Sequence, residues 1–335
     1  MTTLIWIFTA RCNLACRHCY VAPRLTGLGE LSLDEKLRLL REAWDAGVDH
    51  AGFSGGEPII HPHFMELARE AFRLGMTMSL VTNAIALKTD IAKELARLDA
   101  HVYVSLDGTR RAHELLRGIG TWEKALKGLE ALKRAGVSCS TVMAVWKRNF
   151  RTVEDYLELV NGLGLDWAAM IPVMEAGRAK TAGLAVNAKE YLEAVKRGAG
   201  KAEELGIRLS LWCTPFAPVA VDSPNISYWF CRPSRTVDVD PAGNILLCDV
   251  LDFRISNVRK GFREAIREYE NHPLTRLVTN PPRLPEPCRD CPVSKQCRGG
   301  CYARSYITYG SLSGPDPLCP RVAAAASPYS FREKR

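Results

Sequence analysis

Three cysteines near the N-terminus have a spacing that suits a metal cluster. The segment Cys12-Asn-Leu-Ala-Cys16-Arg-His-Cys19 places three thiols in one short loop. Three thiolates can hold one face of a cube-shaped iron–sulfur cluster and leave the fourth iron open. An open iron can chelate the amino and carboxylate groups of S-adenosylmethionine and pass one electron that breaks a C–S bond. The spacing alone also fits a zinc knuckle, or an ordinary four-cysteine cluster with a distant fourth ligand.

A second group of cysteines lies in the last third of the chain. From about Trp212 to Arg321 the sequence is rich in Pro, Gly and Cys and has few long periodic segments, which predicts a core that needs metal as a staple. Paired Cys-x-x-Cys sites are also typical of zinc ribbons, so that alternative stays open. Cys139 lies in an apolar run and is predicted to be a buried core thiol. The cysteines of the second group are Cys213, Cys231, Cys248, Cys288, Cys291, Cys297, Cys301 and Cys319.

Repeated βα units must position the first cysteine loop. Short apolar runs alternate with amphipathic segments, which is the pattern of a parallel sheet. Ser32 with Glu35 forms a capping box that starts one of the helices. We therefore expect an α/β fold, a partial TIM-like (β/α)6 barrel whose chemistry gathers at the C-terminal ends of the strands. The apolar runs are Leu4–Ala10, His50–Ser54, Thr77–Thr82, His101–Leu106, Ser138–Val145 and Asp166–Pro172.

The length of 335 residues suits one large domain and a smaller one. The character of the sequence changes after a predicted bridging helix around Ala188–Leu205. We expect a barrel domain over residues 1–205, a cysteine-rich iron–sulfur domain over 206–325 and a tail over 326–335.

Sequence motifs follow the first two predicted strands. Cys12-x-x-x-Cys16-x-x-Cys19 matches the signature of the radical S-adenosylmethionine superfamily, with His18 at a position that is usually aromatic. Ser54-Gly55-Gly56-Glu57-Pro58 resembles the "GGEP" segment of that family, whose main chain meets the amino group of the methionyl moiety. Two glycines suit such a contact, because the missing Cβ atoms let backbone and ligand approach closely.

The resemblance continues at the next two strand ends. Thr82-Asn83 and Ser105-Leu-Asp107 resemble the third- and fourth-strand motifs, and Arg117 lies where related enzymes place an arginine against the ligand carboxylate. The resemblance thus implies a [4Fe-4S] cluster on Cys12, Cys16 and Cys19 with S-adenosylmethionine bound to it. It also implies a cofactor-binding set of His18, Ser54, Gly55, Gly56, Glu57, Thr82, Asn83, Ser105, Asp107 and Arg117.

The C-terminal cysteines resemble the SPASM domain of radical enzymes that mature peptides and related large substrates. That resemblance implies one or two auxiliary clusters, the first on Cys231, Cys248 and Cys301 and the second on Cys288, Cys291, Cys297 and Cys319. Seven cysteines are one short of two complete clusters. Cys213, which precedes Cys231, is the candidate for the missing ligand, and a three-cysteine cluster with an open iron is the rival.

The resemblance implies a SPASM-type maturase or oxidoreductase. It would cleave S-adenosylmethionine to a 5′-deoxyadenosyl radical and modify a large substrate, either a peptide or protein or a tetrapyrrole, by hydrogen abstraction. The segment from Cys297 to Cys319 resembles the tetrapyrrole branch, and a pterin-cofactor maturase is a further option. Asp249 occupies the position of the base in related sulfatase-maturating enzymes, although a turn or solvated aspartate is the plainer interpretation. No cobalamin domain is apparent, which disfavours methyl transfer.

The formal net charge of +8 is scattered along the chain. It forms no tight basic runs, so we expect no nucleic-acid partner. It suits an acidic partner such as a reduced ferredoxin or flavodoxin-type electron donor, and equally an ordinary solvated surface. Leu4–Ala10 is too short to span a bilayer, and twelve cysteines favour metal ligation in a reducing, cytoplasmic setting. The competing functions are a non-catalytic electron-transfer or cluster-carrier protein and a zinc-stapled binding module.

Overall fold

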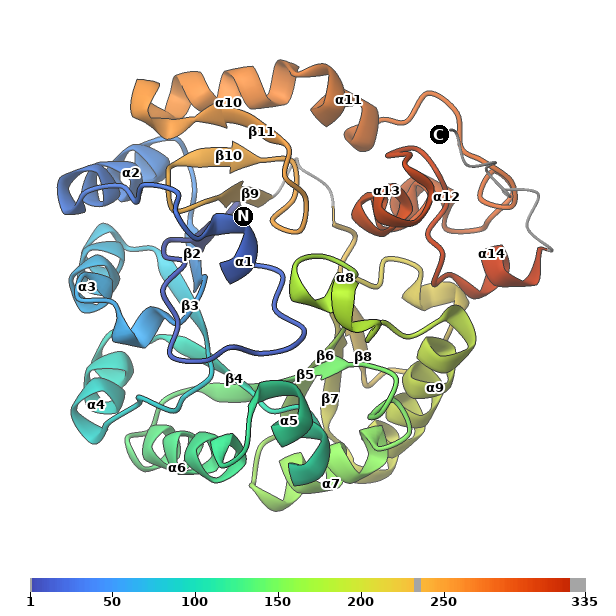
Figure 1. Ribbon diagram of the computed structural model, residues 1–335, viewed down its shortest axis with the longest axis horizontal. Helices are drawn as coiled ribbons and strands as arrows, with labels where there is room; N and C mark the ends of the chain where they lie inside the picture. The colour runs from blue at the N-terminus through green and yellow to red at the C-terminus, as the bar shows by residue number, and fades with distance from the viewer. Residues whose placement is uncertain (1, 232–235, 326–335) are drawn as a thin grey trace.

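One curved sheet runs through the computed structural model, which describes residues 2–231 and 236–325 (Figure 1). The strand order is β11-β10-β9-β1-β2-β3-β4-β5-β6-β7-β8. Strands β1 to β8 pair in parallel with their sequence neighbours. The strands are β1 (Thr3–Ile7), β2 (His50–Ser54), β3 (Thr77–Thr82), β4 (His101–Ser105), β5 (Cys139–Val145), β6 (Trp167–Pro172), β7 (Arg208–Leu211), β8 (Ile226–Tyr228), β9 (Thr236–Val239), β10 (Asn244–Leu246) and β11 (Arg254–Asn257).

Most helices follow the strands along the chain, and the longer helices between strands lie around the outside of the sheet (Figure 1). The predicted capping box is present, since Ser32 Oγ accepts from Glu35 N at 3.2 Å and Glu35 Oε2 accepts from Ser32 N at 2.8 Å. The helices are α1 (Ala22–Leu25), α2 (Leu33–Asp45), α3 (Phe64–Leu74), α4 (Thr89–Arg97), α5 (Arg110–Arg117), α6 (Thr121–Arg134), α7 (Val153–Gly162), α8 (Arg178–Ala182), α9 (Ala188–Leu205), α10 (Phe262–Asn271), α11 (Pro273–Thr279), α12 (Ser294–Cys297), α13 (Tyr302–Tyr309) and α14 (Pro320–Ala324), with 3-10 turns η1 (Pro58–Ile60), η2 (Ala217–Val219) and η3 (Val258–Lys260).

The six predicted strands and the partial barrel are confirmed, with one instructive difference at β1. The apolar run was expected to continue to Ala10, whereas the strand ends at Ile7. Beyond that point the chain turns to bind the segment after β2, because Thr9 O accepts from Gly56 N at 2.8 Å. The end of the apolar run is therefore the start of the cysteine loop.

Strands from the C-terminal third extend the same sheet. Strand β9 pairs in parallel with β1, with Leu4 opposite Val237, and β10 and β11 continue antiparallel from it. Helix α10 packs along β11 (Figure 1). Strand β1 thus pairs with one strand from each half of the chain. The domain boundary expected at residue 205 stays a prediction.

An aromatic cluster fixes the ends of β1 and β2. Phe8 stacks on Phe64 with ring centroids 6.1 Å apart and meets Phe53 edge-on at 6.0 Å. Trp6 packs against Phe8 and Phe53 in the same group. All four side chains are buried, so the strand end that carries the cysteine loop is held by core packing.

Two further expectations concern Cys139 and the membrane. Cys139 was predicted to be buried, whereas it is half-buried and packs against the edge of the main core. Burial raises the pKa of its thiol to about 11. Across residues 2–231 and 236–325, no helix combines the length and the apolar character that a membrane crossing requires.

Replacing Gly128 in α6 with alanine should destabilise the fold. A Cβ at Gly128 would lie 2.3 Å from the carbonyl oxygen of Ala84. Forcing extra atoms into a packed interior costs about 1–3 kcal/mol, which outweighs the gain of about 1 kcal/mol from replacing a helical glycine. We expect a lower thermal unfolding midpoint by circular dichroism. Gly200→Ala in α9, where nothing lies within 4 Å, is the control and should raise the midpoint; a rise in both variants would contradict the packing argument.

Candidate functional site

The first cysteine loop brings three thiols together after β1. Cys16 is buried, while Cys12 and Cys19 are half-buried. The pKa of Cys12 is raised to about 11, chiefly by burial, with contributions from the nearby charges of Glu57, Cys16 and Cys19. Burial also raises the pKa of Cys16. Three thiolates so close together need a compensating positive charge, which a bound metal supplies.

The loop is held by backbone contacts from distant segments. Arg17 N donates to Leu116 O at 2.8 Å, which ties the loop to α5. Arg178, at the start of α8, donates from Nε to Cys16 O at 2.8 Å and from its backbone N to Cys19 O at 3.0 Å. The sequence interpretation missed Arg178, although an arginine just beyond the end of the sixth strand was an available signal.

Gly55 and Gly56 lie directly against the backbone of the first loop. A Cβ at Gly55 would lie 2.5 Å from Thr9 O, and a Cβ at Gly56 would lie 2.0 Å from Arg11 O. Glu57 N donates to Arg11 O at 2.8 Å. The two glycines are therefore required for the approach of two protein segments, in addition to any ligand contact that the motif implies.

Glu57 connects the ends of β2 and β3. Its buried carboxylate accepts from Thr82 Oγ1 at 2.6 Å and from Asn83 N at 2.7 Å. Burial raises the pKa of Glu57, although these two hydrogen bonds oppose the shift. Asn83 Nδ2 in turn donates to Asn13 Oδ1 at 2.8 Å, within the cysteine loop. Three of the predicted cofactor-binding residues thus bind one another and support the loop.

Asp107 and Arg117 form an ion pair beside the loop. Asp107 is buried and accepts from Arg117 and, at 2.8 Å, from Ala144 N. Burial is the largest single influence and acts to raise the pKa of Asp107, but the charge and hydrogen bond of Arg117 together with His18 and His113 outweigh it, and the net shift is downward. Arg117 also acts on the titration of Cys16, so its charge faces the cysteine loop. Asp107 thereby holds the charged Arg117 side chain beside the cysteine loop.

His18 offers an open polar atom at the same place. Its Nδ1 atom is buried and has no hydrogen-bond partner within the described parts of the chain. Burial and the charge of Arg117 lower the pKa of His18 to about 3, so the ring is neutral. An unpartnered buried nitrogen costs free energy unless a ligand binds it. The remaining predicted residues, Ser54 and Ser105, lie at the ends of β2 and β4, half-buried and buried respectively.

The thiols of the first predicted auxiliary set, together with Cys213, come from four separate segments. Burial raises the pKa of Cys213 well above its usual value, and the charges of Cys301 and Cys231 raise it further. Burial likewise raises the pKa of Cys248, with contributions from Cys231 and Cys301. Cys213 follows β7 and adopts a left-handed backbone with φ of 51°. The structure therefore brings Cys213 together with the three cysteines of the first predicted auxiliary set.

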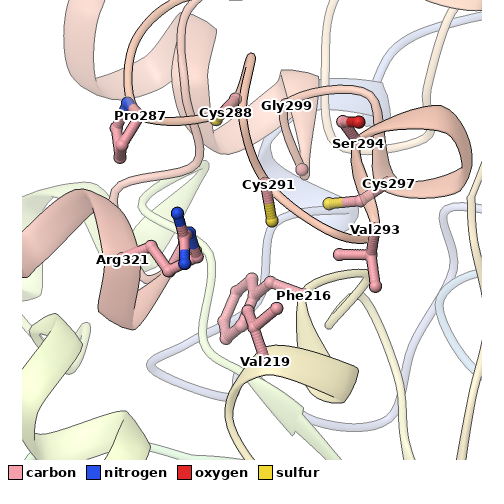
Figure 2. A pocket seen from close by; sticks show the side chains of 12 residues that line it. Phe216, Val219, Pro287, Cys288, Cys291, Val293, Ser294, Cys297, Gly299 and Arg321 are labelled. Carbon is pink, nitrogen blue, oxygen red and sulfur yellow. The ribbon is translucent and has the colours of Figure 1, made fainter.

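The thiols of the second predicted auxiliary set line one cavity. Cys288, Cys291, Cys297 and Cys319 all border it, and Phe216 and Val219 form part of its apolar wall (Figure 2). Burial raises the pKa of Cys288 to about 12, and Cys319 and Cys291 add to the shift. This set of four thiols around one space suits an iron–sulfur cluster or a tetrahedral zinc ion.

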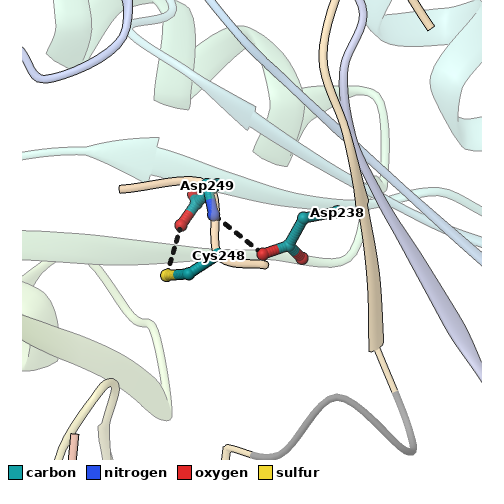
Figure 3. A group of neighbouring side chains, drawn as sticks. All are labelled: Asp238, Cys248 and Asp249. Carbon is teal, nitrogen blue, oxygen red and sulfur yellow. Dashed lines mark hydrogen bonds between the residues drawn. The ribbon is translucent and has the colours of Figure 1, made fainter. Parts of the chain in front are cut away.

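Two carboxylates lie beside Cys248 (Figure 3). Asp238, Cys248 and Asp249 each offer one ligand atom, and these atoms lie within 4.8 Å of one another. Asp249 N donates to Asp238 Oδ2 at 2.9 Å, while Asp249 Oδ2 accepts from Tyr20 OH at 2.7 Å. Burial raises the pKa of Asp249. Asp238 was not predicted, although a carboxylate between two valines of β9 was a signal.

The comparisons with known proteins find one family model and several similar proteins. Residues 6–160 match the radical SAM superfamily. Mycofactocin maturase MftC of Mycobacterium tuberculosis (strain CDC 1551 / Oshkosh) is 28% identical over 99% of this chain and 85% of the relative. AdoMet-dependent heme synthase of Methanosarcina barkeri is 27% identical over 94% of this chain and 95% of its own length.

Solved structures show the same fold. Native anSMEcpe with bound AdoMet superposes with a TM-score of 0.76 at 19% identity, covering 96% of this chain and 94% of that one. SuiB of Streptococcus suis, bound to the precursor peptide SuiA, gives a TM-score of 0.76 at 16% identity, covering 95% and 76%. The cysteine-rich C-terminal region lies within the matched length.

Arg178→Ala should loosen the first cysteine loop. The variant loses a hydrogen bond from a charged donor, which is worth about 1.5–3 kcal/mol, so we expect the metal of the loop to be lost to a chelator at least roughly ten times faster. The measurement is the decay of visible absorption in anaerobic protein that retains only the first set of thiols. Lys180→Ala, an exposed residue of the same helix, is the matched control. Equal rates for the two variants would show that the Arg178 contact does not hold the loop.

Proposed function

We propose that this chain, a radical SAM enzyme by its domain over residues 6–160, cleaves S-adenosylmethionine reductively and takes a hydrogen atom from a large substrate. The observation that carries the proposal is the loop of Cys12, Cys16 and Cys19, held at the strand ends beside Arg117 and His18. Cys12, Cys16 and Cys19 would hold a [4Fe-4S] cluster, which when bound would supply the electron that breaks the C–S bond of S-adenosylmethionine.

The chain's own residues would bind and orient the cofactor. Arg117 stays charged beside Asp107, and a guanidinium is well suited to an anionic carboxylate. His18 Nδ1 is a buried nitrogen with no partner among the described residues, and a bound group can satisfy it. The predicted cofactor-binding residues therefore fall into two classes. Glu57 and Asn83 chiefly support the cysteine loop, while Arg117 and His18 would face the ligand.

A peptide or protein is the substrate class that we favour. The relatives include a mycofactocin maturase, and one solved structure with this fold holds a precursor peptide. A tetrapyrrole is the second candidate, because relatives named AdoMet-dependent heme synthase match nearly the whole chain at similar identity. Both substrate classes would share the same first step, the reductive cleavage of S-adenosylmethionine. They differ in the molecule from which the hydrogen atom is taken.

The first test is production of 5′-deoxyadenosine by reconstituted protein incubated anaerobically with S-adenosylmethionine and dithionite. We expect the parent protein to produce it and a Cys12→Ala/Cys16→Ala/Cys19→Ala variant to produce none. Cys139→Ala, which removes a core thiol outside the three sets, should retain the parental rate. A parent with an intact first cluster that forms no 5′-deoxyadenosine would favour a non-catalytic electron carrier. Adding short peptides or tetrapyrroles then separates the substrate classes.

We also propose two auxiliary clusters in the C-terminal part of the chain. The first would bind to Cys213, Cys231, Cys248 and Cys301, and the second to the cysteines that line the cavity of Figure 2. Support for Cys213 comes from its electrostatic interaction with Cys231 and Cys301. The rival for the first set is a three-cysteine cluster with an open iron.

Cys213→Ala should lower the iron content by about one cluster in three, because a buried cluster that loses a thiolate ligand is less tightly held. The measurement is iron per protein after anaerobic purification, together with the electron paramagnetic resonance spectrum. Cys139→Ala controls for the loss of a half-buried thiol elsewhere. Undiminished iron with an unchanged spectrum would favour the three-cysteine rival, and zinc in place of iron would contradict both.

Asp249 is proposed as the group that accepts a proton once the substrate radical has formed. Its carboxylate contacts Tyr20, which directly follows Cys19, and its own residue directly follows Cys248. It therefore lies between the first cysteine loop and the first auxiliary set. A raised pKa brings a carboxylate closer to the range in which a base is effective near neutral pH.

A reduced ferredoxin or flavodoxin-type protein is proposed as the electron donor, in a cytoplasmic setting. Arg17 is exposed between Cys16 and Cys19, and Ile119 beyond α5 is 95% exposed. Arg17 N contacts Leu116 O, so the charge and the apolar side chain belong to one neighbourhood beside the loop. An acidic carrier would be attracted to it. The twelve cysteines of the sequence suit a reducing compartment, where thiols stay available as metal ligands.

A further inference from the structure

A buried ion pair lies between the two auxiliary sets of thiols. Arg304, on α13, donates from Nε to Asp316 Oδ1 at 2.9 Å and from Nη2 to Asp316 Oδ2 at 2.6 Å. Their side chains are only 6% and 0% exposed. Burying two charges is costly even when they pair in this two-pronged geometry. The contacts around the pair indicate what it contributes in return.

One side of the pair contacts the first auxiliary set. Arg304 Nη2 donates to Cys213 O at 2.6 Å. Asp316 Oδ2 accepts from Cys301 N at 2.9 Å, and Arg304 N donates to Cys301 Sγ at 3.5 Å. Two of the four thiol-bearing residues are thus bonded directly to the pair.

The other side contacts the second set. Cys319 N donates to Asp316 O at 3.1 Å, and Asp316 N donates to Gly299 O at 2.8 Å. Gly299 and Phe216 both line the cavity of Figure 2, and the Arg304 guanidinium carbon lies 6.0 Å from the centre of the Phe216 ring. The same two residues therefore contact both sets, and they reach the second through the backbone of Asp316 and the ring of Phe216.

The two charges do not act equally on the two sets. The Arg304 guanidinium donates to Cys213 O in the first set and, among the contacts of the described residues, reaches the second set only through the Phe216 ring. The Asp316 carboxylate accepts from Cys301 N in the first set and, at 3.0 Å, from Leu318 N, next to Cys319, in the second. The positive end of the pair thus faces the first set, and its negative end faces both.

We infer that the Arg304–Asp316 ion pair sets the difference in reduction potential between the two auxiliary clusters and makes the first cluster the stronger electron acceptor. A nearby positive charge stabilises the reduced, more negative state of a cluster, and a negative charge destabilises it. The first set is also the one whose Cys248 adjoins Asp249. Arg304 and Asp316 are positioning and tuning residues in this account, which rests on the proposed auxiliary clusters.

The test is an anaerobic redox titration followed by electron paramagnetic resonance. It uses full-length protein with Cys12→Ala/Cys16→Ala/Cys19→Ala, so that only auxiliary clusters contribute. Arg304→Gln leaves Asp316 uncompensated and should shift both midpoint potentials down, the first more than the second. Asp316→Asn leaves Arg304 uncompensated and should shift them up. Arg304→Lys keeps the charge and should restore most of the first potential.

Shifts of opposite sign separate tuning from mere support of the fold, which would move both variants alike. Arg321→Gln, at the cavity alone, should change the second potential only. Where Asp316→Asn does not fold, the comparison of Arg304→Gln with Arg304→Lys decides. Equal potentials in those two variants would overturn the inference. If the Cys12→Ala/Cys16→Ala/Cys19→Ala protein holds no iron, both the inference and the proposed auxiliary clusters are overturned. Formation of 5′-deoxyadenosine by the parent protein would still support the first cluster.

Discussion

The close approach of the chain after β2 to the chain after β1 is the contact on which the site depends. Gly56 N donates to Thr9 O, and Glu57 N donates to Arg11 O. The two backbones lie so close together that neither Gly55 nor Gly56 has room for a Cβ atom. From there the support continues through the Glu57 carboxylate to Asn83 and returns to the cysteine loop at Asn13. Three strand ends are joined in a closed series of hydrogen bonds that fixes where the three thiols lie.

The later strands add further supports to the same loop. The segment after β4 supplies Asp107, whose charge holds Arg117, and the neighbouring Leu116 carbonyl binds Arg17. The segment after β6 supplies Arg178 on the carbonyls of Cys16 and Cys19. A curved parallel sheet directs all of these strand ends toward one mouth. A loop with little regular structure of its own thereby becomes well defined.

The sequence predicted what local patterns encode. Strand runs such as His50–Ser54 and Thr77–Thr82 agree with the observed strands, and the Ser32 capping box is present. The pairing of β9 with β1 could not be predicted, because it joins segments far apart in the chain and leaves no local period. Arg178 and Asp238 each had a local signal, but their partners could not be predicted because other segments contribute them. The count of cysteines did single out Cys213, which the fold brings near Cys231 and Cys301.

The position of β9 has a consequence for biosynthesis. β1 leaves the ribosome well before β9, yet one of its two hydrogen-bonding edges is covered by Thr236–Val239 of β9. An uncovered strand edge is a template for wrong pairing and aggregation. Until β9 has been translated the nascent barrel therefore exposes an edge beside its first cysteine loop, and slow non-local pairing prolongs that exposure. Closing the edge also brings the segment with Cys248 next to the loop, so sheet completion and assembly of the metal-binding region are one event in folding.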